Sequence, residues 1–204
     1  MDTFLIFLLV FGLFGWCIHK LLIFTSDTVG SNSPLKVIRV YQISAWSYFT
    51  KFDNLFIYYL LPVAGFMFYL GLNAVFHPDV NYPLAARMGI FGVSLLMLAI
   101  PIQYLILDIN HWAYTENVTI RSNPGQHEID IRFDDQTITL RNGDIERIEM
   151  FPNNSKIRIS YHTYHLQNGD HFILSDRMPG AWAIREYFKK VPVEYYTKRF
   201  PYIK

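Results

Sequence analysis

Three histidines lie close to one tight turn of the chain and raise the question of a metal site. His162, His165 and His171 flank the pair Asn168-Gly169, and imidazole nitrogens are common zinc ligands that must converge on one point at about 2 Å. In a β-strand the odd spacing of His162 and His165 sends their side chains to opposite faces. Two imidazoles across a hairpin make a poor site, so we expect hydrogen-bonded or solvated histidines and no bound metal.

Paired carboxylates are the next candidates, because they can serve as general acid and base. Asp134-Asp135 stands where a turn needs polar residues, and Glu146 and Glu149 are expected on a charged outer face. The sequence has no nucleophile elbow, phosphate-binding glycine loop or His-Glu-x-x-His pattern. Its one cysteine, Cys17, lies in an apolar run. We therefore expect no catalytic residue, no cofactor and no enzymatic activity.

Basic residues near apolar segments are candidates for contact with anionic lipid, since each contributes about 1 kcal/mol at such a surface. These residues are Lys36, Arg39, Lys51, Lys189, Lys190, Lys198 and Arg199. The last four are interleaved with aromatic residues, and the alternative is a solvated tail whose aromatic rings pack on a domain. The formal net charge of +1 is too small for a nucleic-acid-binding surface.

Three apolar runs, over residues 3–24, 55–76 and 88–107, must position these groups. Each is long enough to cross a hydrocarbon core of roughly 30 Å as a helix. Only the polar link 77–87 separates the last two, which predicts a transmembrane hairpin. The first run follows Asp2 and lacks the basic start of a signal peptide, so we expect it to be retained.

These runs predict a membrane region over residues 1–109. Within it, residues 35–52 mix aromatic and basic side chains, which favours either an amphipathic interfacial helix or a helix docked on a soluble domain. The basic residues between the first two runs place that segment in the cytoplasm by the positive-inside rule. The N-terminus is then outside, and the part of the chain after Asp108 is cytoplasmic.

From residue 110 the long apolar runs give way to short alternating ones. The alternation predicts strands over 112–121, 128–133, 137–140, 145–150, 156–166 and 171–174. Asn168-Gly169 is a strong hairpin signal, because both positions of such a turn favour positive φ. Pro179 opens a predicted helix that Pro192 ends.

The segments 137–149, 168–174 and 182–188 resemble the pleckstrin-homology-like (PH-like) domains of bacterial membrane proteins. That resemblance implies a transmembrane hairpin followed, over residues 110–204, by a small β-rich PH-like barrel capped by a C-terminal helix. The additional first run departs from this two-span arrangement, so we expect an anchor of three transmembrane helices here. The resemblance also implies a place in the bacterial inner (cytoplasmic) membrane and a role in recognition rather than catalysis.

Three functions are compatible with this organisation. The leading hypothesis is a membrane accessory or scaffold protein whose cytoplasmic PH-like domain binds another membrane or cytoplasmic protein, as a homo- or hetero-oligomer and without nucleic acid. The second is a regulator that senses anionic membrane lipid. The third is a component of a membrane enzyme or transporter that uses Asp108, Asn110, His111 and Trp112 at the end of the last apolar run.

Overall fold

A computed structural model describes the chain except residues 1–10, 12–14, 16–17, 20, 24, 27–29, 74–82, 135 and 155–158. In chain order its elements are β1 (Arg39–Tyr41), α2 (Ala45–Phe49), α3 (Phe52–Asn73), α4 (Pro83–Ala113), β2 (Thr119–Asn123), β3 (Glu128–Arg132), β4 (Thr137–Leu140), β5 (Ile145–Pro152), β6 (Ser160–Leu166), β7 (His171–Ser175), α5 (Ala181–Tyr187) and β8 (Val193–Tyr195).

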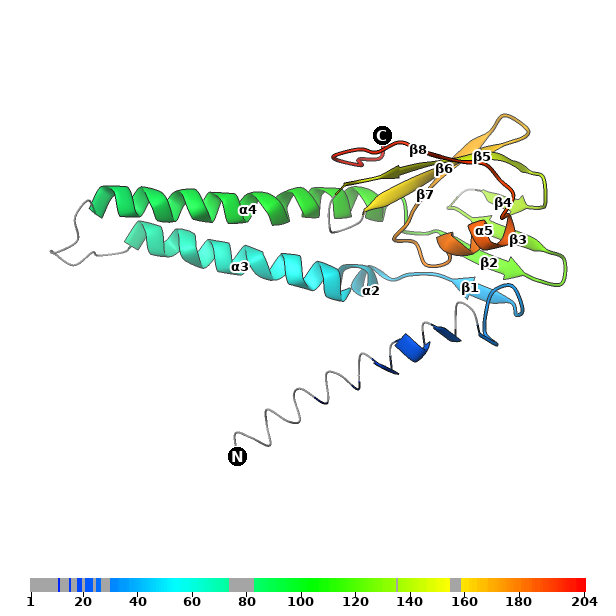
Figure 1. The fold of residues 1–204 in the computed structure, drawn as a ribbon, viewed down its shortest axis with the longest axis horizontal. Coiled ribbons are helices and arrows are strands. Elements are labelled where there is room, and N and C mark those ends of the chain that lie inside the picture. The colour runs from blue at the N-terminus through cyan, green and yellow to red at the C-terminus, as the bar shows by residue number, and fades with distance from the viewer. Residues whose placement is uncertain are drawn as a thin grey trace.

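The strands form two four-stranded sheets, with the orders β1-β2-β3-β4 and β7-β6-β5-β8. The helices α3 and α4 lie side by side and project from these sheets (Figure 1). They are inserted between β1 and β2, which pair antiparallel with Val40 opposite Arg121. The hairpin therefore leaves the sheet at one strand and returns at its neighbour.

The core between the sheets and α5 follows from the alternation along the strands. In β3, Ile129 and Ile131 are fully buried while Arg132 is exposed, as expected for a strand with one face on a core. Tyr164 of β6 stacks on Phe172 of β7 with ring centroids 4.8 Å apart. The apolar face of α5 covers these rows and contributes the buried Ile184. Burial of this apolar surface is the main favourable term that holds the domain together.

The two long helices pack closely on each other and expose apolar side chains elsewhere. A Cβ on Gly71 would lie 3.2 Å from Cγ2 of Ile90, and the rings of Phe68 and Phe91 meet edge to face at 5.0 Å. Away from this seam, seven large described side chains on the hairpin are each at least 59% exposed: Tyr59, Phe66, Tyr69, Leu84, Met88, Leu96 and Ile100.

The prediction of three transmembrane helices is wrong for the residues that the structure describes. In the described part of the chain one helix, Leu84–Ala113, is long and apolar enough to cross a membrane, and the apolar part of α3, Ile57–Asn73, is shorter. Asn54 near the start of α3 is fully buried and accepts hydrogen bonds from Arg177 and Tyr104, so this end of the helix is held by protein contacts rather than by lipid. Most of the predicted first span, residues 3–24, lies outside the described residues.

The predicted closed barrel is also wrong, because the two sheets remain separate. One side of β5 pairs antiparallel with β6 and the other pairs parallel with β8, where Glu149 lies opposite Glu194. The strand β8 thus occupies the edge that β4 would need to close a barrel.

Local patterns were more successful in the β-rich part. The Asn168-Gly169 turn joins β6 to β7 as predicted, with His165 opposite His171 and Gly169 at φ 88°. The predicted closing helix is α5. Where an amphipathic helix was expected over 35–52, the structure has the strand β1 and the short helix α2.

We expect Gly180→Ala to destabilise the protein more than Gly143→Ala. Gly180 has φ 83°, and an added Cβ would overlap the ring of Tyr41, the residue that docks β1 against the start of α5. Gly143 has φ 96° but open space around it, so the matched variant carries only the backbone cost of about 1–2 kcal/mol. Thermal unfolding of the purified chain in detergent measures both, and equal losses would contradict close packing at Gly180.

Candidate functional site: the junction between the helical hairpin and the sheets

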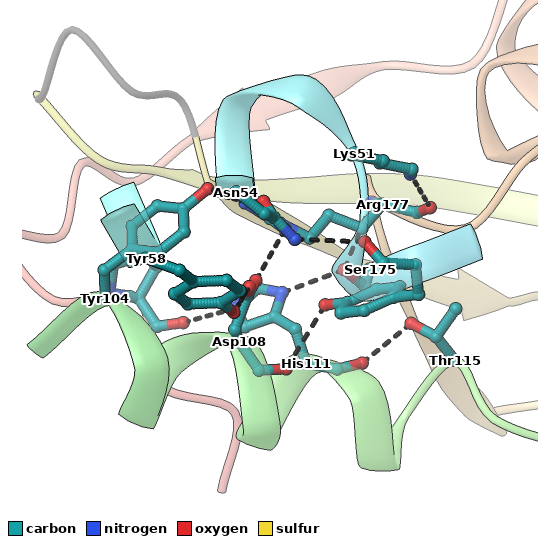
Figure 2. A network of polar contacts seen from close by, with 11 residues as sticks. Lys51, Asn54, Tyr58, Tyr104, Asp108, His111, Thr115, Ser175 and Arg177 are labelled. Atoms are coloured by element: carbon teal, nitrogen blue, oxygen red, sulfur yellow. Dashed lines mark hydrogen bonds and ion pairs between the residues drawn. The ribbon is translucent and has the colours of Figure 1, made fainter. Parts of the chain in front are cut away.

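A buried ion pair joins the helical hairpin to the second sheet. Asp108 near the end of α4 is fully buried, and its Oδ1 lies 2.5 Å from Nη1 of Arg177 in the connection between β7 and α5 (Figure 2). The Arg177 side chain is only 11% exposed. Two charges withdrawn from water must compensate each other, since an unpaired buried charge is strongly unfavourable.

Polar groups from α3 and α4 complete the surroundings of this pair. Tyr58 donates its hydroxyl hydrogen bond to Oδ2 of Asp108. Asn54 Oδ1 accepts from Nη1 of Arg177 at 2.8 Å and from the hydroxyl of Tyr104 at 3.0 Å. Arg177 Nη2 in turn donates to the Tyr104 hydroxyl. The guanidinium is thereby held on three sides by the two helices (Figure 2).

The helix α2, which follows β1, also contacts the Asp108–Arg177 pair. The hydroxyl of Tyr48 donates to the backbone carbonyl of Asp108 at 3.2 Å, and its ring lies 5.6 Å from the Arg177 guanidinium carbon. Lys51 Nζ donates to the Arg177 carbonyl at 3.2 Å. Burial alone lowers the pKa of Arg177, but the Asp108 carboxylate and the phenols of Tyr104 and Tyr48 outweigh it and raise that pKa above its ordinary value. Arg177 is therefore a permanent cation.

A second layer of contacts, centred on His111, ties α4 to β7 and to the tail. His111 Nε2 lies 2.9 Å from the carbonyl oxygen of Pro201, and Nδ1 lies 2.8 Å from Oγ of Ser175. A carbonyl can only accept, so Nε2 carries the proton and Nδ1 accepts from Ser175. Asn110 makes two hydrogen bonds with the backbone of Ile203, at 2.8 and 3.0 Å.

The polar groups of the junction have a structural role. Asp108, Asn110 and His111, proposed as reactive groups in the enzyme hypothesis, each bind protein groups. Trp112 packs its ring on Tyr48 at 5.0 Å. These contacts fix the angle between the hairpin and the sheets and do not favour the third hypothesis.

The other histidines and carboxylates pair with each other rather than around a shared centre. His162 is buried and lies 2.9 Å from Asp176, while His165 lies 3.2 Å from Glu149. The rings of His165 and His171 are 6.1 Å apart. Among the residues that the structure describes, no group of three or more metal-ligating side chains converges.

The candidate carboxylates that the structure describes also have ordinary partners, while Asp135 lies outside the described residues. Asp134 accepts from Asn117 at 3.1 Å, and Glu146 and Glu149 both lie within 3.6 Å of Arg147. Such contacts are typical of turns and charged outer faces.

The predicted lipid-contact residues fall into separate places on the molecule. Lys36 is exposed just before β1, and Arg39 donates from Nε to the carbonyl of Asn32. Lys51 belongs to the junction. Lys189 and Lys190 follow α5 and are exposed, and Lys189 pairs with Glu186 at 3.1 Å.

Lys198 and Arg199 lie in the tail after β8. Lys198 Nζ donates to the Tyr161 hydroxyl at 2.6 Å and lies 4.2 Å from the Phe151 ring centroid, while Arg199 is exposed. Lipid contact by the seven residues stays a prediction from the sequence.

Sequence reasoning missed most of the junction, including Arg177, Asn54 and the three tyrosines Tyr48, Tyr58 and Tyr104. One signal was available: Asp108 is an acidic residue directly at the end of an apolar run. Its partner lies in a distant loop, and no local pattern connects the two.

The fold and a comparison with protein families agree on what this architecture is. A family model described as a PH domain matches residues 40–176, more than half of the chain. The chain belongs to the PH domain family. The match begins in β1, runs through both long helices and ends at Asp176, so the PH domain of this protein includes residues on both sides of the hairpin. No curated protein and no solved structure matches the chain.

We expect Asp108→Asn to lower the free energy of unfolding by about 3–5 kcal/mol, because it leaves the Arg177 guanidinium buried without its counter-charge. The double variant Asp108→Leu with Arg177→Met should lose less than the sum of the two single changes. Arg141→Gln, which breaks the exposed pair with Glu128, is the control and should shift the thermal midpoint little. Additive single losses would show that the two charges are not coupled.

Proposed function

We propose that this chain is a membrane-anchored accessory or scaffold protein, whose PH domain binds a partner protein on the cytoplasmic face of the bacterial inner membrane. Membership of the PH domain family supports a role in binding proteins or lipids. The observation that carries the membrane part is the apolar surface around α3 and α4, where large side chains such as Leu84 and Leu96 are more than two thirds exposed. Such a surface requires lipid or protein to cover it.

The dimensions of the hairpin fit a bilayer. With 31 residues at about 1.5 Å each, α4 is roughly 46 Å long, against a hydrocarbon core of about 30 Å. The shorter apolar part of α3, Ile57–Asn73, is at the lower limit for a spanning helix. The end of α3 that carries Asn54 remains at the junction, outside the lipid in this proposal.

The pairing of β1 with β2 adds a constraint on topology. These two strands belong to one sheet, although the whole hairpin separates them in sequence. Both ends of the hairpin must therefore lie on the same side of any bilayer, so α3 and α4 either both cross it or neither crosses. Because α4 meets the requirements for crossing, we favour the case in which both do. The basic Lys36, Arg39 and Lys51 beside the first crossing then favour a cytoplasmic PH domain.

The partner-binding surface in this proposal is a pair of adjoining grooves at the end of α5. One has a volume of about 400 Å³ and the other about 490 Å³. Both are lined by Phe188 and Val191 together with Glu186 and Lys189. A lining that combines apolar and charged side chains is suited to a protein segment that buries an apolar side chain and matches the charges.

Cysteine labelling tests the topology, after Cys17→Ser removes the native cysteine. A cysteine at Ala85, beside the link between the helices, should react with an impermeant maleimide from the side opposite to cysteines at Lys36 and Asn142. The physical reason is that β1–β2 pairing keeps Lys36 and the PH domain together, whereas the link lies across the lipid. Sealed vesicles of known orientation provide the measurement.

Labelling of Ala85→Cys and Asn142→Cys from the same side would show that the hairpin does not cross. Labelling of Lys36→Cys and Asn142→Cys from opposite sides would contradict the same-side pairing of β1 and β2. Each result would overturn the proposed anchor.

Affinity purification in mild detergent with crosslinking tests the partner-protein role. We expect a recurrent stoichiometric partner whose recovery falls at least about tenfold in Arg185→Glu, which reverses an exposed charge lining the first groove. The matched charge reversal Arg132→Glu, on the exposed face of β3, should leave recovery unchanged. A strictly monomeric protein without a recurrent partner would argue against a scaffold.

A further inference from the structure

We propose that α2 and the tail over residues 195–204 form a collar around the base of the hairpin, which rests on the anionic headgroups of the bilayer. The collar would fix the depth of the hairpin and the orientation of the PH domain. This inference rests on the proposed insertion of the hairpin, and it assigns a lipid-binding surface distinct from the grooves at α5.

The collar lies on two sides of one short stretch of α4. On one side the tail is bound by its backbone, through Ile203 to Asn110 and through Pro201 to His111. On the other side α2 packs the ring of Phe49 on Trp112, with centroids 5.7 Å apart. In Figure 1 the red tail folds back beside the base of α4, and α2 stands at the base of α3.

The collar is at the depth where headgroups are expected. A hydrocarbon core of about 30 Å is crossed by about 20 helical residues. The apolar run 88–107 provides these, so residues 108–112 of α4 lie at the adjoining membrane surface. The contacts of Asn110, His111 and Trp112 therefore place the collar at that level.

The exposed side chains of the collar have the chemistry of a membrane interface. Trp46 on α2 is 79% exposed, and Tyr202 and Phe200 in the tail are 45% and 41% exposed. The rings of Phe200 and Tyr202 are nearly parallel, at 6° and 6.5 Å. Tryptophan and tyrosine are enriched at headgroup level, because one part of the ring system is apolar and the other part is polar.

The charge of the collar favours anionic lipid over neutral lipid. Residues 195–204 contain Lys198, Arg199 and Lys204 and no acidic residue. Arg199 and Lys204 are exposed. The other basic pair, Lys189 and Lys190, differs because Glu186 neutralises part of its charge and because it follows α5 rather than the junction. That pair is the matched control.

Depth-dependent fluorescence quenching tests the collar on the full chain in vesicles. In the Cys17→Ser background, bimane is attached to Tyr202→Cys in the collar, to Leu96→Cys in the hairpin or to Lys190→Cys as control. The vesicles are phosphatidylcholine with or without phosphatidylglycerol and carry nitroxide at the headgroup or in the acyl chain. All three positions are exposed, so the labels should not disturb folding.

We expect the headgroup nitroxide to quench the label at position 202, more strongly with phosphatidylglycerol and less at about 1 M salt, where the Debye length is about 3 Å. The acyl-chain nitroxide should quench the label at position 96, and neither should quench the label at position 190. Arg199→Gln with Lys204→Gln should lower the ratio of headgroup-bound to headgroup-free collar, measured by quenching at position 202, about tenfold or more. Lys189→Gln with Lys190→Gln should not change it.

The outcomes separate this inference from the proposed anchor. Quenching at 96 without quenching at 202 overturns the collar and leaves the anchor intact. No quenching at 96 overturns the anchor and, with it, the collar. Equal quenching at 190 and 202, or no response to lipid charge, also overturns the collar. Position 202 unquenched in vesicles but shielded from iodide in native membranes would show that a protein covers this surface instead.

Discussion

The ion pair between Asp108 and Arg177 is the interaction on which the arrangement of the molecule depends. It connects the end of the longest helix to the loop between β7 and α5, and both partners are almost completely buried. Around it, Asn54 and three tyrosines bring α2, α3 and α4 to the same point. Exposed ion pairs contribute little to stability, whereas breaking a buried pair costs several kcal/mol. The hairpin is therefore held at a defined angle to the PH domain rather than by a flexible linker.

This rigidity gives a physical meaning to the position of the hairpin inside the PH domain. The insertion lies between the adjacent antiparallel strands β1 and β2. The hydrogen bonds between these strands therefore hold the two ends of the hairpin together. The tail adds a second closure, because β8 occupies the edge of β5 and the following residues bind α4. The hairpin is thus connected to both sheets through several separate contacts. If the hairpin is the proposed anchor, a binding surface on the PH domain has few orientations relative to it, which lowers the entropic cost of meeting the proposed partner.

The sequence predicted those parts of the fold that local patterns determine. The turn at Asn168-Gly169, the alternating strands and the helix α5 all follow from residues within a few positions of each other. The apolar runs located α3 and α4, but run length alone did not show that Asn54, near the start of α3, is buried in the junction. The closed barrel failed for a non-local reason, since the occupant of the β5 edge, β8, comes from a distant part of the chain.

The junction shows the same limit more sharply. Asp108 looked like the ordinary polar end of an apolar run, and Arg177 looked like a charged residue in a loop. The side chains of both residues bind groups that are distant in sequence. In addition, β1 is a strand of only three residues whose pairing depends on the hairpin returning to it. These features depend on one another: β1 pairs with β2 only if α4 returns the chain there, and the ion pair to Arg177 fixes where α4 ends against the sheets. The non-local contacts are therefore a single cooperative set. For this reason, reasoning from residues close in sequence predicted the separate elements but not the junction between them.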